Sequence, residues 1–213
     1  MPLPSADHAI ASRRKTAVES FGLASAAIGP ITAGMSVFVV TRGQWSFLDA
    51  ILHILDSTQA PATVSVWSWA LADYEVVVLD RLRRDGRVTA GTLMIDEGAR
   101  KVNVVALQDW RESFGPDSVR LLQSHAKICR VVTADGLKFL LRGSANLNRN
   151  PRFEQFDLTE GGADHDLVER IESEFEPLSL DVSTSRVTKG SKISERYDAT
   201  EIGLFGTVKP WRK

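Results

Sequence analysis

The sequence has little cysteine and no long apolar run, and each shortage excludes a class of protein. Its 213 residues include a single cysteine, Cys129, so no disulfide can form within the chain, which fits a reducing compartment. No apolar stretch approaches the ~20 residues that a membrane-spanning helix needs. Near the N-terminus, Glu19 and Gly22 interrupt anything resembling a signal peptide. We therefore expect a cytoplasmic protein that makes no contact with a membrane.

Signatures for metals and nucleotides are also missing. No cysteine and histidine cluster has the spacing of metal ligands, and neither a phosphate-binding P-loop nor a dinucleotide-binding fingerprint occurs. We expect no metal and no cofactor. The net charge is −1, but it is spread unevenly, with +3 over residues 1–150, −7 over 151–178 and +3 over 179–213. Any attraction to nucleic acid would therefore be local.

Apolar periodicity predicts strands that alternate with helices. The spacing of apolar residues and the Gly and Pro breaks favour an α/β fold, with a mixed, largely parallel sheet flanked by helices on both faces. A helix is favoured over 97–110, although its valine-rich part leaves a strand open. The other expected strands are 35–40, 62–69, 87–95, 118–123, 125–132, 138–141 and 152–159, and the other expected helices are 7–27, 45–55, 72–84 and 164–175.

Three units are expected along the chain: an N-terminal helical extension over 1–30, a catalytic domain over 31–178 and a basic C-terminal tail over 179–213. The Arg13-Arg14-Lys15 cluster is expected on a solvated helix face, with a phosphate contact as the alternative. The tail either docks on the body or acts as a partly mobile arm. We also expect a solvated face for the glutamates of the last helix, Glu169, Glu172 and Glu174.

The most chemically dense stretch is a predicted hairpin that starts at His125. On a strand, His125 and Lys127 would project from the same face. The turn Ala134-Asp135-Gly136 leads to a return strand that ends in Gly143-Ser144-Ala145-Asn146. An imidazole, an ammonium, a hydroxyl and a carboxamide are thus gathered together. Lysine and asparagine can hold phosphate oxygens and histidine can attack phosphorus, so the group suits a phosphodiester substrate.

Each of these residues also has a structural interpretation. His125 could be a hydrogen-bonded core histidine, Ser144 and Asn146 could complete a turn, and Glu154 could be a surface charge on an edge strand. A lysine within an apolar strand needs an anionic partner or a water-filled cleft, which strengthens the catalytic interpretation of Lys127. The segment Trp67-Ser68-Trp69 is either core packing or the wall of a pocket.

The pattern H-x-K followed by G-S-x-N resembles the HKD motif of the phospholipase D superfamily. Its members carry these residues at the positions of His125, Lys127, Gly143, Ser144 and Asn146. Glu154 stands where they have a carboxylate that orients the histidine. The sequence departs from the motif at one position, because Val132 replaces its aspartate and the nearest acid is Asp135. In that family the aspartate is a structural support.

The resemblance implies a metal-independent, two-step reaction through a phosphohistidine. Two H-x-K motifs are needed and this chain has one, so the resemblance implies a homodimer that completes one composite site from two copies of His125, Lys127, Ser144, Asn146 and Glu154. A nuclease that cleaves DNA or RNA is favoured. The alternatives are a hydrolase or transferase of lipids or other phosphodiesters, and an inactive binding or assembly protein. The acidic segment 151–178 argues against a polyanion if it faces the cleft.

Overall fold

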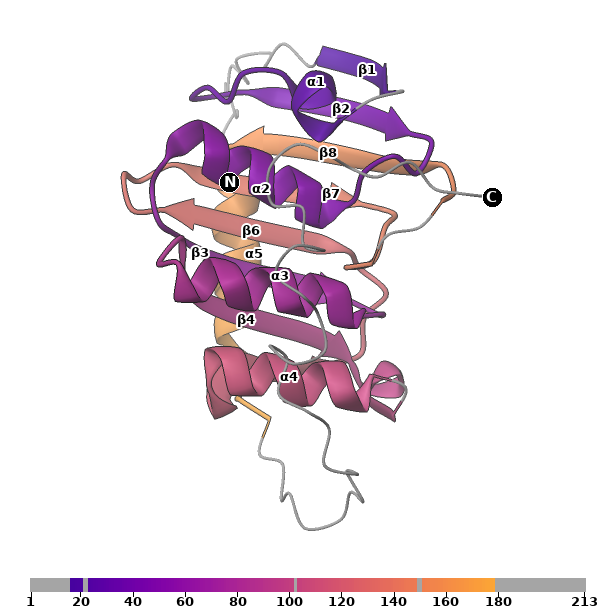
Figure 1. Ribbon diagram of the computed structural model, residues 1–213, viewed down its shortest axis with the longest axis vertical. Helices are drawn as coiled ribbons and strands as arrows, with labels where there is room; N and C mark the ends of the chain where they lie inside the picture. Colours follow the sequence, from indigo (N-terminus) through magenta and orange to yellow (C-terminus); the bar gives the residue numbers. More distant parts are fainter. Residues whose placement is uncertain (1–15, 21–22, 102, 149–150, 179–213) are drawn as a thin grey trace, which may run out of the picture.

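An eight-stranded sheet runs through the part of the chain that the structure describes, which in this computed structural model is residues 16–20, 23–101, 103–148 and 151–178. Its order is β1-β2-β8-β7-β6-β3-β4-β5 (Figure 1). The strands are β1 (Thr16–Ser20), β2 (Ser36–Thr41), β3 (Ala62–Ser68), β4 (Val88–Asp96), β5 (Val119–Leu122), β6 (Ile128–Thr133), β7 (Lys138–Gly143) and β8 (Glu154–Glu160). The helices are α1 (Ala24–Ile28), α2 (Phe47–Thr58), α3 (Asp73–Arg84), α4 (Val104–Phe114) and α5 (Ala163–Ser173), with short 3₁₀ turns at Glu97–Lys101 and Pro116–Ser118.

The sheet is mixed, as expected, but the expectation that it is largely parallel holds only in part. Neighbouring strands are parallel in the pairs β1–β2, β3–β4 and β4–β5. They are antiparallel in β2–β8, β3–β6, β6–β7 and β7–β8. Short connections join β6, β7 and β8 in sequence, and strands joined in this way have to run antiparallel. The centre of the sheet is therefore antiparallel and its two sides are parallel.

The N-terminal helix expected up to Ala27 is wrong over Thr16–Ser20 and confirmed over 24–27. Thr16–Ser20 form β1, which pairs in parallel with β2, and the helix α1 begins only at Ala24. Pairing with a distant strand overrides local helical preference. The earlier part of that expected helix, the Arg13-Arg14-Lys15 cluster and the tail 179–213 lie outside the described residues.

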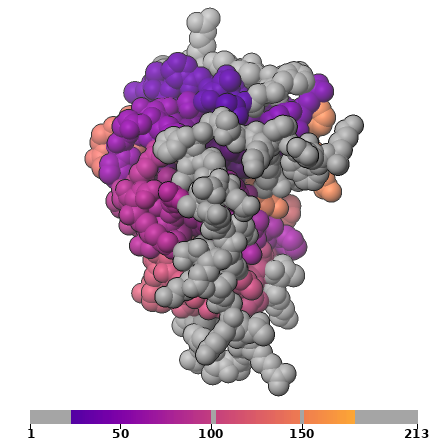
Figure 2. Space-filling model, viewed as in Figure 1, coloured from indigo at the N-terminus to yellow at the C-terminus, as the bar shows by residue number. Residues whose placement is uncertain are grey.

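Four helices cover one face of the sheet and bury the main core. In Figure 1, α1, α2, α3 and α4 all lie in front of the strands, and in Figure 2 they follow one another down the left of this face. A capping box starts α2, because the Ser46 N–H donates to the Asp49 carboxylate at 2.7 Å. Phe47 and Ile51 are then fully buried against the sheet, as is Trp110 of α4. Within the described chain, no helix is long and apolar enough to cross a membrane.

Of the helices that the structure describes, α5 is the one that covers the other face, behind the left half of the sheet in Figure 1. It packs on a smaller apolar cluster that includes Trp67, Met94, Leu140 and Val168. The expectation of helices on both faces is thereby confirmed. The unequal covering matters for the site, because α5 lies away from the strand ends on the right of Figure 1.

Candidate active site

Several strand ends meet at one edge of the sheet, on the right of Figure 1. The parallel strands β3 and β4 both end there. Because β6 runs antiparallel to β3, its first residue, Ile128, pairs with Trp67 near the end of β3, and Ile128 also pairs with Arg142 near the end of β7. The segment 123–127 before β6 and the segment 144–146 after β7 therefore reach the same edge. The fold brings the predicted motif together from its separate parts.

The expectation that His125 and Lys127 lie side by side on a strand is wrong. β6 begins only at Ile128, and residues 123–127 form no strand. The Ser124 N–H instead donates to the carboxylate of Asp96 at 2.9 Å. This bond holds the segment against the end of β4 and takes a backbone group that strand pairing would use. As a result the His125 side chain is exposed and that of Lys127 is buried.

Lys127 is a buried ammonium whose charge is favoured by two carboxylates. Its Nζ donates to the carbonyl oxygen of His125 at 2.5 Å, and 6% of the residue is exposed. Burial lowers the pKa of Lys127 below its ordinary value, while the charges of Glu154 and Asp96 act in the opposite direction. A buried charge is costly unless something compensates it, and an incoming phosphate would do so. The position thus suits a group that receives an anion.

Glu154 begins β8 and is buried, with 9% exposed. The interpretation of Glu154 as a surface charge on an edge strand is wrong, because β8 lies between β2 and β7. The Ser144 hydroxyl donates to its carboxylate and accepts the N–H of Gln155 at 3.1 Å. Ser144 therefore ties the end of β7 to the start of β8. The expected bond from Glu154 to the His125 ring stays a prediction.

The glycine and asparagine of the motif have identifiable structural roles. A Cβ added at Gly143 would collide with the carbonyl oxygen of Gln155, so the close approach of β7 to β8 requires glycine here. The Asn146 side-chain oxygen accepts the N–H of Trp69 at 3.1 Å. This bond orients the carboxamide and leaves its nitrogen as the end that can donate to a ligand. Asn146 thus completes a loop, as one interpretation proposed, without losing its donor.

Sequence reasoning missed Asp96 at this edge and left the roles of Trp67 and Trp69 undecided. Asp96, the last residue of β4, accepts N–H groups from Ser124 at 2.9 Å and Gly98 at 2.8 Å. The Ser124 N–H is the main cause that holds the pKa of Asp96 below its ordinary value, and the Trp69 side chain also donates to it. Trp67 is buried in the α5 cluster, whereas Trp69 is 40% exposed at the site. An acid at the carboxyl end of a parallel strand is the signal that could have identified Asp96.

Val132, the departure from the motif, lies at the opposite end of β6 from Lys127. Val132 is five positions after Lys127, which corresponds to about 16 Å of extended chain. Val132 pairs with Thr63 and Lys138 there. Asp135 lies in the adjoining turn, where its carboxylate accepts the Thr133 hydroxyl. Neither residue can reach a phosphate held at Lys127, so the departure concerns the hairpin and not the reacting groups.

The acidic residues of α5 are largely paired on the face of the sheet opposite α1–α4. The expectation that Glu172 is solvated is wrong. It is buried and accepts hydrogen bonds from Arg130 at 2.5 Å, Ser65 at 2.6 Å and the Trp67 indole at 2.7 Å. Glu169 is the second carboxylate on Arg130, at 2.9 Å. We refer to Arg130, Glu172, Ser65, Trp67 and Glu169 as the α5 clamp. Its carboxylates are directed at the sheet and not at the strand-end site.

One group of side chains has a geometry that could hold a metal ion. His165, Asp166 and Glu169 offer ligand atoms within 4.8 Å of one another. Asp166 pairs with Lys138 at 3.1 Å and Glu169 with Arg130, so cationic side chains already serve these carboxylates. The Arg130 Nε–H also donates to Nε2 of His165 at 3.4 Å, which places the proton of a neutral ring on Nδ1. The group is better described as an ion-pair cluster than as a metal site.

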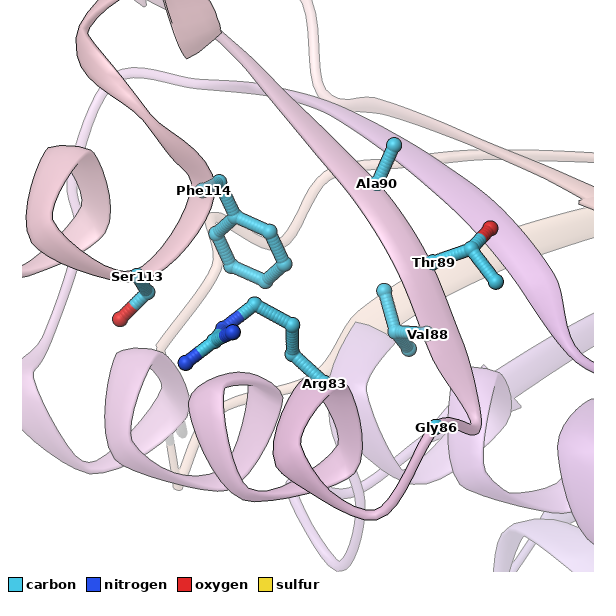
Figure 3. Close-up of a pocket in the computed structure, with 7 residues that line it drawn as sticks. All are labelled: Arg83, Gly86, Val88, Thr89, Ala90, Ser113 and Phe114. Atoms are coloured by element: carbon cyan, nitrogen blue, oxygen red, sulfur yellow. The ribbon is translucent and has the colours of Figure 1, made fainter.

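A hollow of about 470 Å³ lies at the other end of β4. Figure 3 shows Arg83 and Phe114 facing each other across it, with Val88 and Thr89 on the strand side. Asp96 is eight positions after Val88 along β4, which is about 26 Å of strand. This hollow is therefore separate from the strand-end site.

Comparisons with known proteins gave structural likenesses alone. No protein-family model and no curated protein matches the chain. Solved structures that are similar to it include Nuc, a phospholipase D family member from Salmonella typhimurium, at 15% identity and a TM-score of 0.48, covering 68% of this chain and 100% of that one. NucT from Helicobacter pylori is similar at 12% identity and a TM-score of 0.42, covering 68% and 99%. Yeast tyrosyl-DNA phosphodiesterase is similar at 15% identity and 0.39, covering 65% and 38%.

Nuc is a member of the family that the motif resembles. At these identities and TM-scores, the likenesses concern the fold alone.

Proposed function

We propose that the protein is a metal-independent phosphodiesterase that cleaves nucleic-acid backbones, with His125 as the attacking group. The observation that carries the proposal is the buried ammonium of Lys127 behind the exposed His125. A phosphodiester at this edge would supply the direct ion-pair partner that Lys127 lacks among the described residues, and it would meet the imidazole at the surface. The Asn146 amide nitrogen is a second donor for a phosphate oxygen.

The expected reaction has two steps. A ring nitrogen of His125 attacks phosphorus, so an N–P bond forms as the bond to the leaving oxygen breaks, and a second imidazole gives that oxygen a proton. Water then attacks the phosphohistidine while the second imidazole removes its proton, and the N–P bond breaks. Lys127 and Asn146 stabilise the non-bridging oxygens, whose charge grows in each transition state.

The second imidazole is proposed to be His125 of a second copy. One chain supplies one H-x-K motif, and its His125 is exposed at an open edge, where a two-fold partner could approach. A composite site of this kind requires self-association. Sedimentation of the full chain at assay concentration should therefore show a dimer, and an active monomer would rule the composite site out.

We favour nucleic acid as the substrate because the acidic residues of α5, which would argue against a polyanion, are largely paired with cations. The carboxylates of α5 would repel a polyanion if they faced the site. Glu172 and Glu169 instead pair with Arg130, Asp166 with Lys138 and Asp164 with Arg142. Their charges are largely neutralised, and α5 lies behind the half of the sheet away from the strand ends (Figure 1).

The test is cleavage of plasmid and single-stranded DNA in excess EDTA. The wild-type chain should cleave, and His125→Ala should lose the activity while remaining folded. A matched control is His53→Ala, which removes a histidine of α2 whose Nε2 bonds to the Gly29 carbonyl. Loss of cleavage in EDTA, or equal activity in His125→Ala, would contradict the proposal. Salt-sensitive binding without turnover would favour a binding protein instead.

A further inference from the structure

Two large aromatic side chains remain exposed beside the site. Phe153 is 64% exposed, more than any other large hydrophobic side chain in the part of the chain that the structure describes, and Trp69 is 40% exposed. Single exposed apolar residues are common on protein surfaces. The position of these two in relation to the proposed phosphate site is what calls for an explanation.

Phe153 and Trp69 flank Lys127 along the strand-end edge. Phe153 directly precedes Glu154 at the start of β8, and Trp69 follows the end of β3, where its N–H bonds to Asn146. Between β8 and β3 the sheet holds β7 and β6, so the two aromatic positions are about 14 Å apart. Lys127, which precedes β6, lies between them. A strand of nucleic acid with its phosphate at Lys127 would carry one neighbouring base towards each aromatic residue.

An arginine supports one of these rings. The guanidinium carbon of Arg42 lies 5.2 Å from the centre of the Phe153 ring, within the range of a cation–π contact. This contact holds the ring in place at the surface. It also puts a positive charge beside a stacking surface, the combination by which proteins bind single-stranded nucleic acid without reading its sequence.

We propose that Phe153 and Trp69 stack on unpaired bases on either side of the cleaved phosphate, which makes single-stranded nucleic acid the preferred substrate. This inference rests on the proposed function, because the phosphate that fixes the register is the one at Lys127. Bases in a duplex stack on one another and must be unpaired or flipped before a side chain can reach their faces. The expected preference is therefore for strands that are already open.

The test measures binding of a fluorescein-labelled oligothymidylate of about fifteen nucleotides to the full chain, in the His125→Ala background so that nothing is cut. Phe153→Ala and Trp69→Ala should each weaken binding about tenfold, as loss of one base stack does. Phe153→Trp should keep the affinity, and Phe153→Leu, which is apolar but cannot stack, should not. The matched control is Leu167→Ala, which truncates a side chain of α5 that is 48% exposed and should change nothing.

A strand of the same length without bases separates stacking from charge. The His125→Ala parent should bind it more weakly than oligothymidylate, and the two aromatic variants should bind both strands alike. Equal binding of both strands by the parent, or unchanged binding in both variants, would overturn the inference. So would variants that alter only the sedimentation of the protein or its binding to phosphatidylglycerol vesicles, because the surface would then serve a second copy or a lipid.

The proposed function is checked separately with bis(p-nitrophenyl) phosphate, a phosphodiester that has no base. If the wild-type chain hydrolyses neither this compound nor DNA, the catalytic proposal fails, while the binding contrast still decides the stacking proposal. If it hydrolyses both and the aromatic variants bind oligothymidylate normally, the stacking proposal alone fails.

Discussion

Lys127 and Arg130 are two buried cations three residues apart in the chain, and their surroundings differ. Each has less than a tenth of its surface exposed, at 6% and 8%. Arg130 is bound by Glu172 at 2.5 Å and by Glu169 at 2.9 Å. Among the described residues, Lys127 forms no ion pair, and its hydrogen bond goes to a backbone carbonyl. The same degree of burial therefore accompanies a charge with two direct ion pairs in one case and, among the described residues, a charge with none in the other.

The difference indicates that Arg130 stabilises the fold and that Lys127 serves the proposed site. The charge of Arg130 is used within the protein, where the α5 clamp fastens a helix to the sheet. The charge of Lys127 faces the strand-end edge, beside the exposed His125, and only the more distant carboxylates Glu154 and Asp96 favour it. Burial of a polar group is thus a poor guide to its role, and the pairing of the group is a better one.

Breaking the clamp should have the largest effect on stability. Glu172→Ala leaves Arg130 buried without its main partner and removes the acceptor of Ser65 and Trp67, so the free energy of unfolding should fall by about 3–5 kcal/mol. Urea denaturation followed by circular dichroism measures this. The control is Glu174→Ala, which breaks the exposed pair with Arg170 and should change the stability by less than about 1 kcal/mol. Equal effects of the two variants would show that the clamp is not structural.

Removing Lys127 should have the opposite effect, because activity should be lost while stability is kept. Lys127→Met replaces a buried charge that has no direct ion pair among the described residues with an apolar group, so stability should be kept or raised, while kcat should fall by about 10²–10³-fold through lost transition-state stabilisation. Thermal unfolding and hydrolysis of bis(p-nitrophenyl) phosphate give the two quantities. Lys138→Met, at an exposed lysine paired with Asp166, is the matched control and should retain kcat. A large loss of stability in Lys127→Met, with normal kcat, would show that Lys127 has a structural role like that of Arg130.

Asp96→Asn tests the compensation of Lys127 by pH. Burial lowers the pKa of Lys127, and the Asp96 charge raises it. Activity that needs the ammonium is present at low pH and is lost as the pH rises through this pKa. Without the Asp96 charge the pKa falls further, so the alkaline limb of the kcat profile should move to lower pH. Asp56→Asn, at the Arg87 pair far from the motif in sequence, should leave that limb in place, and a limb that moves to higher pH in Asp96→Asn would contradict the assignment.

The smallest loss of stability is expected from changing Glu169, the exposed member of the α5 clamp. Glu169 is the second carboxylate on Arg130, but its side chain is 53% exposed. Water screens this pair, so Glu169→Gln should lower the free energy of unfolding by less than about 1 kcal/mol. Denaturant titration of this variant beside Glu172→Ala decides whether the buried carboxylate dominates. A loss as large as that of Glu172→Ala would mean that the clamp acts as a unit.

Sequence patterns correctly predicted the helices and strands that are encoded by their own apolar periodicity. They failed where pairing with a distant strand determines the secondary structure. The helix α3, the strand β3 and the β6–β7 hairpin were found because their own residues encode them. β1 was taken for a helix because its partner β2 is found only in the folded sheet.

In the candidate site, too, local patterns were predicted and contacts between distant residues were not. The motif residues were named from their spacing, but the ends of the strands were not, so His125 and Lys127 were expected on one face. Residues 123–127 lie outside the strand, and the Ser124 N–H bonds to the carboxylate of Asp96, which is 28 positions away in the chain. The buried role of Glu172 was likewise hidden, because Arg130 and Ser65 lie on strands that only the fold brings under α5.

Attack by His125 on phosphorus would leave a covalent intermediate that can be trapped. The full chain would be mixed with bis(p-nitrophenyl) phosphate, denatured at alkaline pH during the first turnover, digested and analysed by mass spectrometry. A p-nitrophenyl phosphoryl group should be found on His125 and be absent from the digest of His125→Ala. Turnover with no adduct on His125, or with the adduct on another residue, would contradict attack by His125.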